Sequence, residues 1–242
     1  MPDLKALLFD VDDTLFSTTK FAHRARRNSV SAMIDAGLDL PEEQVFRELE
    51  EVIREFSSNY GHHYDKLLQR LPTAAYEGVN PALVVSAGVI AYHDTKFRGL
   101  KPFEDVIPFL EACAAAGLRL GVVTHGWTAK QAEKLIRLDL VTRFDPGAIF
   151  ISDQVGISKP NPKLYALALR EMGLAASEVM MVGDNPANDI APPLELGMHA
   201  TWVKRAAKPG LSAPPETDHI VDDFRELATI LRDQYEVPIA DF

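Results

Sequence analysis

The chain has 242 residues, 47% of them hydrophobic and 25% charged. This composition is typical of a globular protein and excludes a disordered or collagen-like chain. Because 25 Lys and Arg residues stand against 35 Asp and Glu residues, the formal net charge is -10, which disfavours binding to nucleic acid or to an anionic membrane.

The cysteine content and the N-terminal residues indicate the cellular compartment of the protein. Cys113 is the single cysteine, so no intrachain disulfide can form. Asp3, Lys5 and Asp10 interrupt the apolar stretch that a secretory signal needs, and no window reaches the roughly 20 apolar residues of a membrane span. We therefore expect a cytoplasmic protein without a membrane partner, either a monomer or a homodimer.

Short apolar runs, each bounded by acidic residues, glycine or threonine, predict buried strands. These runs are residues 6–9, 118–123, 148–151, 179–182 and 200–203, with a further short strand within residues 219–224. Apolar residues at helical spacing separate them, at Val106, Phe109, Leu110 and Cys113, at Ala132, Leu135 and Ile136, and at Leu164, Leu167 and Ala168. The alternation predicts an α/β fold, a doubly wound and Rossmann-like parallel sheet with helices on both faces.

Capping residues and prolines predict particular helix boundaries. Asn161 caps a helix that has Pro162 in its first turn and ends at Gly173. Pro192 and Pro193 fit a helix only within its first turn, where the N–H groups have no partner inside the helix. We therefore predict that a helix starts at residue 190 or 191.

Residues 16–96 break the alternation of strands and helices. The apolar residues Val45, Leu49, Val52, Ile53 and Phe56 recur at helical spacing, and similar spacing on both sides predicts further helices without a convincing strand. We expect a helical cap domain at residues 16–96, inserted into an α/β core domain of residues 1–15 and 97–242.

Three carboxylates, those of Asp10, Asp12 and Asp13, directly follow the first predicted strand. In open parallel sheets, ligands bind at the carboxyl ends of the strands. Close carboxylates at the end of a buried strand repel one another unless a cation offsets their charge. The alternative is a simple acidic turn, but Mg²⁺ takes oxygen ligands and shares its shell readily with a phosphate.

Further polar residues are expected at the same edge of the sheet. They are Thr124, His125 and Gly126 after the second strand, Lys159 between the third strand and the next helix, and Asp184 with Asp189 after the fourth strand. Taken singly, Lys159 is typical of a solvated lysine and Asp189 of a helix cap. Together they describe a cation site beside an anion site, which is what phosphoryl chemistry requires.

These motifs resemble, in type and order, those of the haloacid dehalogenase (HAD) superfamily. The family pattern D-x-D-x-T corresponds to residues 10–14, the hydroxyl of the second motif to Thr124, the motif lysine to Lys159, and G-D-x-x-x-N-D to residues 183–189. The resemblance places the chain in the phosphatase branch that carries a helical C1-type cap after the first motif.

By this resemblance Asp10 is the catalytic nucleophile that forms an aspartyl-phosphate. Asp12 is the acid that protonates the leaving oxygen and then activates water. An ordinary aspartate is ionised at neutral pH, so Asp10 needs no base, whereas Asp12 has to be kept protonatable by its surroundings. Thr124 and Lys159 are implied as catalytic residues that bind the transferring phosphoryl oxygens.

The same resemblance implies a Mg²⁺ cofactor. Its expected ligands are the carboxylates of Asp10 and Asp184 and the backbone carbonyl of Asp12, with Asp189 completing or orienting the shell. The metal would neutralise the charge that develops during phosphoryl transfer.

Substrate contacts are implied for Thr124, His125, Gly126 and Lys159. His125 stands where related phosphatases commonly carry Asn, and the next aromatic residue, Trp127, is available to stack on a planar leaving group or only to cover the following helix. We expect a small phosphorylated metabolite as substrate, either a nucleoside monophosphate or a sugar phosphate.

Other functions on the same fold stay open at this point. Dehalogenase members carry a non-acidic residue at the position of Asp12, which disfavours a 2-haloacid dehalogenase. Nothing in the sequence supports a phosphomutase. A non-catalytic ligand-binding module is the remaining alternative, although every expected catalytic position is filled.

Polar residues in the predicted cap have two interpretations. The basic cluster consists of Lys20, His23, Arg24, Arg26 and Arg27. It either attracts an anionic substrate or forms a solvated helix face. His62, His63 and Tyr64 lack metal-ligand spacing and are expected at the surface.

Overall fold

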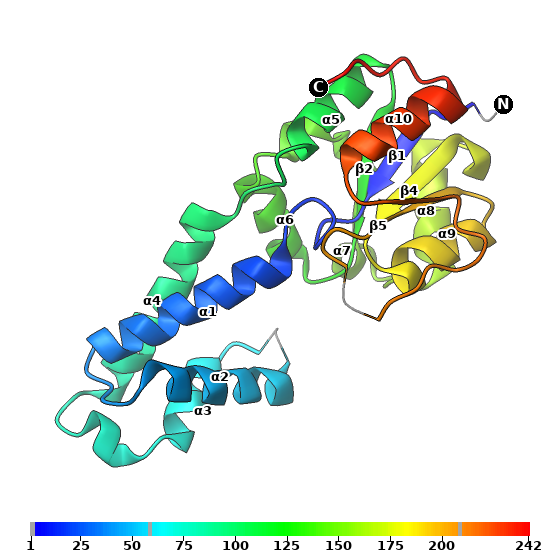
Figure 1. Cartoon of the computed structure of the whole chain (residues 1–242). Helices are drawn as coiled ribbons and strands as arrows, with labels where there is room; N and C mark the ends of the chain where they lie inside the picture. Colours follow the sequence, from blue (N-terminus) through cyan, green and yellow to red (C-terminus); the bar gives the residue numbers. More distant parts are fainter. Residues whose placement is uncertain (1–2, 58–59, 208–209) are drawn as a thin grey trace. The chain divides into compact units, whose positions relative to one another are not determined.

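The computed structural model describes residues 3–57, 60–207 and 210–242, and it divides into two compact units (Figure 1). The α/β unit comprises the residues up to Thr18 and from Lys101 onward, and the helical unit comprises Thr19–Leu100. Each unit has a hydrophobic core of its own.

Six parallel strands form the sheet of the α/β unit, in the order β3-β2-β1-β4-β5-β6. They are β1 (Ala6–Phe9), β2 (Arg119–Thr124), β3 (Ile149–Ile151), β4 (Val179–Gly183), β5 (His199–Val203) and β6 (His219–Val221). The strand order reverses beside β1, where Leu7 lies opposite Leu120 of β2 and Met180 of β4. The predicted doubly wound α/β fold is confirmed, and the reversal marks the place where such sheets bind ligands.

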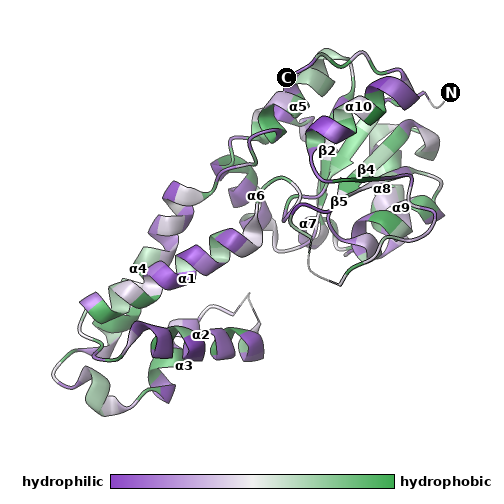
Figure 2. Ribbon diagram, viewed as in Figure 1, coloured by the Kyte–Doolittle hydropathy of each residue, from purple (hydrophilic) through white to green (hydrophobic). Residues whose placement is uncertain are grey.

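Helices cover both faces of this sheet. They are α5 (Val106–Ala115), α6 (Thr128–Arg137), α7 (Ser152–Val155), α8 (Pro162–Met172), α9 (Ala191–Glu195) and α10 (Phe224–Tyr235). Phe9 packs its ring against Phe109 of α5 and Phe224 of α10, with centroids 6.2 and 5.9 Å apart. On the opposite face, Leu8 shares a buried cluster with Tyr165 of α8. Figure 2 shows hydrophobic residues along the strands and a mixture of hydrophobic and polar residues on the helices.

The helix boundaries follow the capping residues. Asn161 accepts a hydrogen bond from the backbone N–H of Lys163, and Gly173 ends α8 in the left-handed conformation at φ 67°. Helix α9 begins at Ala191 and holds Pro192 and Pro193 in its first turn. Both boundary predictions are therefore confirmed.

The buried face of α6 differs from the predicted one. The sequence pattern placed Ile136 on the apolar face, but its side chain is 67% exposed. Gln131, Leu135 and Leu138 are buried instead. Residues at i, i+4 and i+7 share a helix face, so Gln131 takes an inward position that an apolar pattern does not reveal.

The helical unit contains α1 (Thr18–Asp35), α2 (Glu42–Phe56), α3 (His63–Arg70) and α4 (Pro81–Gly99). Their buried side chains include Val30, Met33, Leu49, Leu67 and Val84. Tyr64 also packs against this cluster, contrary to its expected surface position, and its hydroxyl donates to the buried Ser29 Oγ at 2.8 Å. Among the described helices, none combines the length and the apolar character needed to cross a membrane.

A buried ion pair connects the loop after β5 with the segment before α5. Arg205 donates from Nη1 to both carboxylate oxygens of Asp105, at 2.6 and 2.7 Å. The guanidinium carbon lies 4.0 Å from the ring centroid of Phe103 and 4.6 Å from that of Phe224, and Nη2 donates to the backbone carbonyl of Thr14 at 3.1 Å. Arg205 therefore fastens the loop that carries the first motif to the body of the unit.

We predict that Arg205→Met lowers the free energy of unfolding by about 3–5 kcal/mol, because it leaves the carboxylate of Asp105 buried without its cation. Urea unfolding followed by circular dichroism measures the loss. Arg170→Met, which breaks an exposed pair with Glu171, is the control and is expected to change stability little. Equal effects of the two variants would contradict the role given to Arg205.

A second polar cluster lies where β5, β6 and α10 meet. His219 Nε2 and the hydroxyl of Tyr235 are 2.9 Å apart, and that hydroxyl lies 3.3 Å from His199 Nδ1. Asp218 Oδ2 lies 3.7 Å from the same nitrogen of His199. Burial lowers the pKa of His219 below its usual 6.5, and His199 acts in the same direction, whereas Asp218 opposes them. The folded state thus favours a neutral His219.

We expect this group to make stability depend on pH. The unfolded chain takes up a proton on His219 more readily than the folded chain, so this contribution is complete above about pH 6.5 and declines as the pH falls below it. Urea unfolding at pH 7.5 and 5.5 should show a smaller loss for His219→Gln than for the unchanged protein. The exposed His93→Gln is the control, and parallel pH dependences of all three proteins would refute the assignment.

Candidate active site

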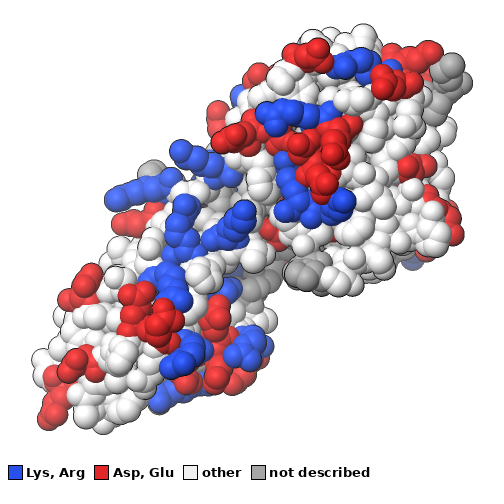
Figure 3. Space-filling view, in the orientation of Figure 1, with Lys and Arg blue, Asp and Glu red and all other residues white. Residues whose placement is uncertain are grey.

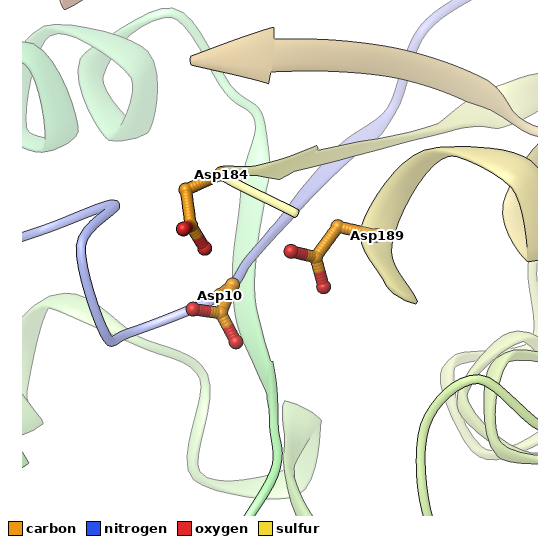
Figure 4. A group of neighbouring side chains, drawn as sticks. All are labelled: Asp10, Asp184 and Asp189. Carbon is orange, nitrogen blue, oxygen red and sulfur yellow. The ribbon is translucent and has the colours of Figure 1, made fainter. Parts of the chain in front are cut away.

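Three carboxylates meet at the carboxyl ends of β1 and β4. Asp10 follows β1, Asp184 follows β4, and Asp189 lies in the wide turn η5 (Pro186–Ile190). One oxygen from each carboxylate lies within 4.8 Å of the other two, and Figure 4 shows the three groups facing one another. The expected convergence of the first and fourth motifs is therefore what the structure shows.

Lys159 is buried among these carboxylates. Its Nζ lies 2.7 Å from Asp10 Oδ1 and 2.6 Å from Asp189 Oδ1, and only 1% of its side chain is exposed. Burial alone would lower the pKa of this lysine, but Asp10 and Asp189 raise it above its usual value. Lys159 is therefore a fixed ammonium inside the site, and the interpretation as a solvated lysine is wrong.

The three carboxylates still carry more negative charge than Lys159 offsets. Burial, together with the charges of Asp10 and Asp189, raises the pKa of Asp184 to about 8. Burial likewise raises the pKa of Asp10, although the Lys159 ammonium opposes this. Carboxylates crowded in this way suit a hard divalent cation with oxygen ligands. The donor set thus fits the expected Mg²⁺.

Asp189 is held on both of its oxygens by the protein. Oδ1 accepts from Lys159, and Oδ2 accepts from the backbone N–H of Asn185 at 3.0 Å. Gly183 leaves the space for this side chain, because an added Cβ there would lie only 2.5 Å from Asp189 Oδ2. These contacts fix the side chain of Asp189, which can therefore orient Lys159 and the neighbouring carboxylates.

The second motif supplies a buried hydroxyl at the end of β2. Thr124 is fully buried, and its Oγ1 has no hydrogen-bond partner among the described residues. A buried hydroxyl without a partner is costly, so a ligand oxygen that hydrogen-bonds to it would relieve this cost. This placement agrees with the phosphoryl contact expected of Thr124.

The loop that follows Thr124 is joined to neighbouring segments. His125 is exposed, and its Nδ1 lies 2.7 Å from the Oγ of Ser158, directly before Lys159. The backbone N–H of Gly126 donates to Ser152 Oγ at 3.0 Å, so this amide is already engaged inside the protein. His125 therefore offers an exposed side chain for the expected substrate contact, whereas Gly126 has only its backbone.

Asp12 has different surroundings from those expected. Both of its oxygens contact Lys134 Nζ, at 2.7 and 2.6 Å, and they also accept from Gln131 Nε2 and Thr18 Oγ1, at 3.1 and 2.8 Å. Burial would raise the pKa of Asp12, but Lys134 and these hydrogen bonds lower it below its usual value. Asp12 is therefore held as a carboxylate, rather than in the readily protonated form that we expected.

Lys134, Gln131 and Thr18 were not singled out from the sequence. Gln131 and Lys134 lie among the polar residues of α6, where they are typical of a solvated face. Their position in the chain could have identified Gln131 and Lys134, because a helix that begins at the ligand-binding edge of a sheet presents its first turns to the site.

Trp127 lies in the α/β unit, whereas the basic cluster lies in the helical unit. The ring of Trp127 is 53% exposed, and Lys130 Nζ lies 4.4 Å from its centroid. In the helical unit, Arg27 pairs with Glu43 and Arg26 lies 3.8 Å from a carboxylate oxygen of Glu50. Figure 3 shows acidic and basic side chains mixed over part of the visible surface and several basic side chains gathered in another part.

Comparison with known families agrees with this geometry. A family model described as haloacid dehalogenase-like hydrolase matches residues 4–197. The chain belongs to this family. The resemblance based on the four motifs is thus confirmed.

Two similar relatives are named glyceraldehyde 3-phosphate phosphatase. The one from Methanopyrus kandleri is 43% identical over 238 residues, which are 95% of this chain and 98% of the relative. The one from Methanocaldococcus jannaschii is 36% identical over 229 residues, which are 95% of this chain and 97% of the relative. The alignments therefore span both compact units.

Solved structures show the same fold at lower identity. A HAD phosphatase from Thermococcus onnurineus is 22% identical, with a TM-score of 0.65 over 94% of this chain and 98% of that one. A HAD-hydrolase from Bacillus subtilis, solved bound to magnesium, is 21% identical, with a TM-score of 0.62 over 94% and 98%.

We predict that Gly183→Ala weakens Mg²⁺ binding by about 10–100-fold, because the added methyl group displaces Asp189 and the groups that Asp189 orients. Calorimetric titration of the protein with Mg²⁺ measures the change. Gly147→Ala is the control, since an added Cβ there meets its nearest atom, Asp145 Oδ1, at an ordinary 3.4 Å. Unchanged affinity in Gly183→Ala would show that Asp189 does not support a metal site.

Proposed function

We propose that this protein is a Mg²⁺-dependent phosphatase that hydrolyses a small sugar phosphate, with glyceraldehyde 3-phosphate as the candidate substrate. The observation that carries the proposal is the cluster of Asp10, Asp184, Asp189 and Lys159 at the ends of β1 and β4. The relative that is 43% identical over nearly the full chain supports the choice of substrate.

In the first half of the proposed reaction, Asp10 attacks phosphorus. A bond forms between its carboxylate oxygen and phosphorus while the bond from phosphorus to the ester oxygen breaks. The negative charge of the bound phosphate ester raises the pKa of Asp12, so Asp12 takes up a proton when the substrate binds and gives it to that oxygen, which leaves as the alcohol of glyceraldehyde. Lys159 holds Asp10 in place through its contact with Oδ1 and offers its positive charge to the phosphoryl oxygens.

In the second half, water attacks the aspartyl-phosphate on Asp10. Asp12 takes a proton from that water as the new bond to phosphorus forms, and the bond between phosphorus and Asp10 breaks to release inorganic phosphate. The two halves together convert the ester and one water into alcohol and phosphate and return both aspartates to their starting forms.

The remaining residues of the site bind and orient. Thr124 would donate its unpartnered buried hydroxyl to a phosphoryl oxygen, and His125 lies accessible beside Ser158 for a contact with the sugar. Asp10, Asp184 and the backbone carbonyl of Asp12 would hold Mg²⁺, with Asp189 orienting them. When bound, the metal supplies positive charge that offsets the charge developing on the phosphoryl group.

The alternative functions have less support. The presence of Asp12 disfavours a 2-haloacid dehalogenase, because that reaction has no leaving oxygen to protonate. The relatives that align over nearly the whole chain are named for a triose phosphate, which favours a sugar phosphate over a nucleoside monophosphate.

The test is phosphate release from glyceraldehyde 3-phosphate, a nucleoside monophosphate and p-nitrophenyl phosphate, each with Mg²⁺ and with EDTA. We expect Mg²⁺-dependent turnover with a preference for the triose phosphate. Asp10→Asn should lower it by more than about 10³-fold with the fold retained, since an amide is a poor nucleophile.

The control for Asp10→Asn is the same chemical change at Asp139, whose side chain is 88% exposed. Chloride release from a 2-haloacid without Mg²⁺ would establish the dehalogenase instead. Absence of turnover on every substrate would favour the ligand-binding module.

A further inference from the structure

Helix α6 presents two polar side chains to Asp12. Gln131 and Lys134 are three residues apart, so they lie on neighbouring positions of one helix face. The Nζ of Lys134 contacts both oxygens of Asp12, and the amide of Gln131 donates both to Asp12 Oδ2 and to the backbone carbonyl of His125, at 3.1 and 2.7 Å. The helix thereby connects the first motif with the second.

The position of α6 is itself held by the surrounding structure. Asp153 of α7 accepts from the backbone N–H and the hydroxyl of Thr128, at 2.9 and 2.8 Å, which anchors the first turn of α6. Gly126 gives Gln131 its space, because a Cβ at Gly126 would lie 2.7 Å from Gln131 Nε2. Gln131 is only 3% exposed. The contacts with Asp12 therefore come from a supported helix rather than from free surface chains.

The hydrogen bonds also define one orientation of the Asp12 carboxylate. Thr18 donates to Oδ1, Gln131 donates to Oδ2, and Lys134 lies against both. These three donors come from two separate segments, so the Asp12 side chain cannot rotate without losing at least one of the hydrogen bonds. The side chains of Lys134 and Asp12 are 18% and 30% exposed, so water screens their attraction only in part.

We propose that Lys134 is a positioning residue of the reaction, which acts through Asp12. This inference rests on the proposed function. Lys134 holds the carboxyl group of Asp12 in the orientation needed for proton transfer to the leaving oxygen. Because that proton goes to the leaving oxygen, the contribution of Lys134 belongs to the step in which the ester bond breaks.

The proposal predicts that the loss of activity on removing the Lys134 charge depends on the leaving group of the substrate. The alkoxide that leaves a sugar phosphate has to be protonated, whereas p-nitrophenolate is stable without a proton. Lys134→Met removes the charge and keeps most of the length of the side chain. We expect it to lower kcat/KM for glyceraldehyde 3-phosphate by about 10–100-fold, a part of the effect that general acids provide, and to change kcat/KM for p-nitrophenyl phosphate less than about threefold.

Two controls separate positioning from damage to the structure. Arg137→Gln removes a cation from the same helix at a position where it pairs with Glu133, and should leave both kcat/KM values unchanged. Inhibition by inorganic phosphate should be the same in Lys134→Met as in the unchanged enzyme, because the phosphate contacts come from Thr124 and Lys159. Equal losses on both substrates, or weaker inhibition by phosphate, would overturn the proposal.

A double-mutant cycle tests whether Lys134 acts through Asp12. In an Asp12→Asn background, Lys134→Met should cost nothing further on glyceraldehyde 3-phosphate, and additive losses would overturn the inference. Failure of the proposed function can be told apart from failure of this inference, because the unchanged protein would then show no Mg²⁺-dependent turnover. Failure of this inference would show as normal turnover in that protein with no dependence of the Lys134→Met effect on the leaving group.

Discussion

The arrangement of the site depends on the buried ammonium of Lys159. Three carboxylates at the ends of two adjacent strands would repel one another strongly in a region shielded from water. Lys159 lies within hydrogen-bond distance of Asp10 and Asp189 and offsets part of that repulsion. The charge that remains, visible in the raised pKa of Asp184, makes the same place suited to a divalent cation. The same crowding of carboxylates thus explains both the burial of Lys159 and the suitability of the site for a cation.

The sheet order is what brings these groups together. Strand β1 lies between β2 and β4, so the residues that follow the three strands meet although they are far apart in the sequence. Parallel pairing puts all the carboxyl ends at one edge. Packing of Phe9 against α5 and α10 on one face, and of Leu8 near α8 on the other, fixes the strand that carries Asp10.

The first motif also places its two aspartates in contrasting surroundings. Asp10 faces a buried lysine and the other acidic residues of the site, whereas Asp12 lies against Lys134, Gln131 and Thr18. The proposed nucleophile and the proposed proton carrier need different environments, and these two aspartates, only two residues apart, receive them from different neighbours. One lysine thus contacts Asp10 and a second contacts Asp12.

The sequence alone determined the strands, the helix boundaries marked by Asn161, Gly173 and the proline pair, and the motif residues, because apolar period and capping chemistry are local properties of the chain. It also indicated the convergence of Asp10, Asp184, Asp189 and Lys159, since parallel strands end at one edge. Only the tertiary structure decided that Lys159 is buried, that Ile136 is exposed and Gln131 buried, and that Lys134 holds Asp12 as a carboxylate. These features depend on which side chains from distant segments share a space, and on the electrostatic energy of that space, neither of which a residue pattern contains.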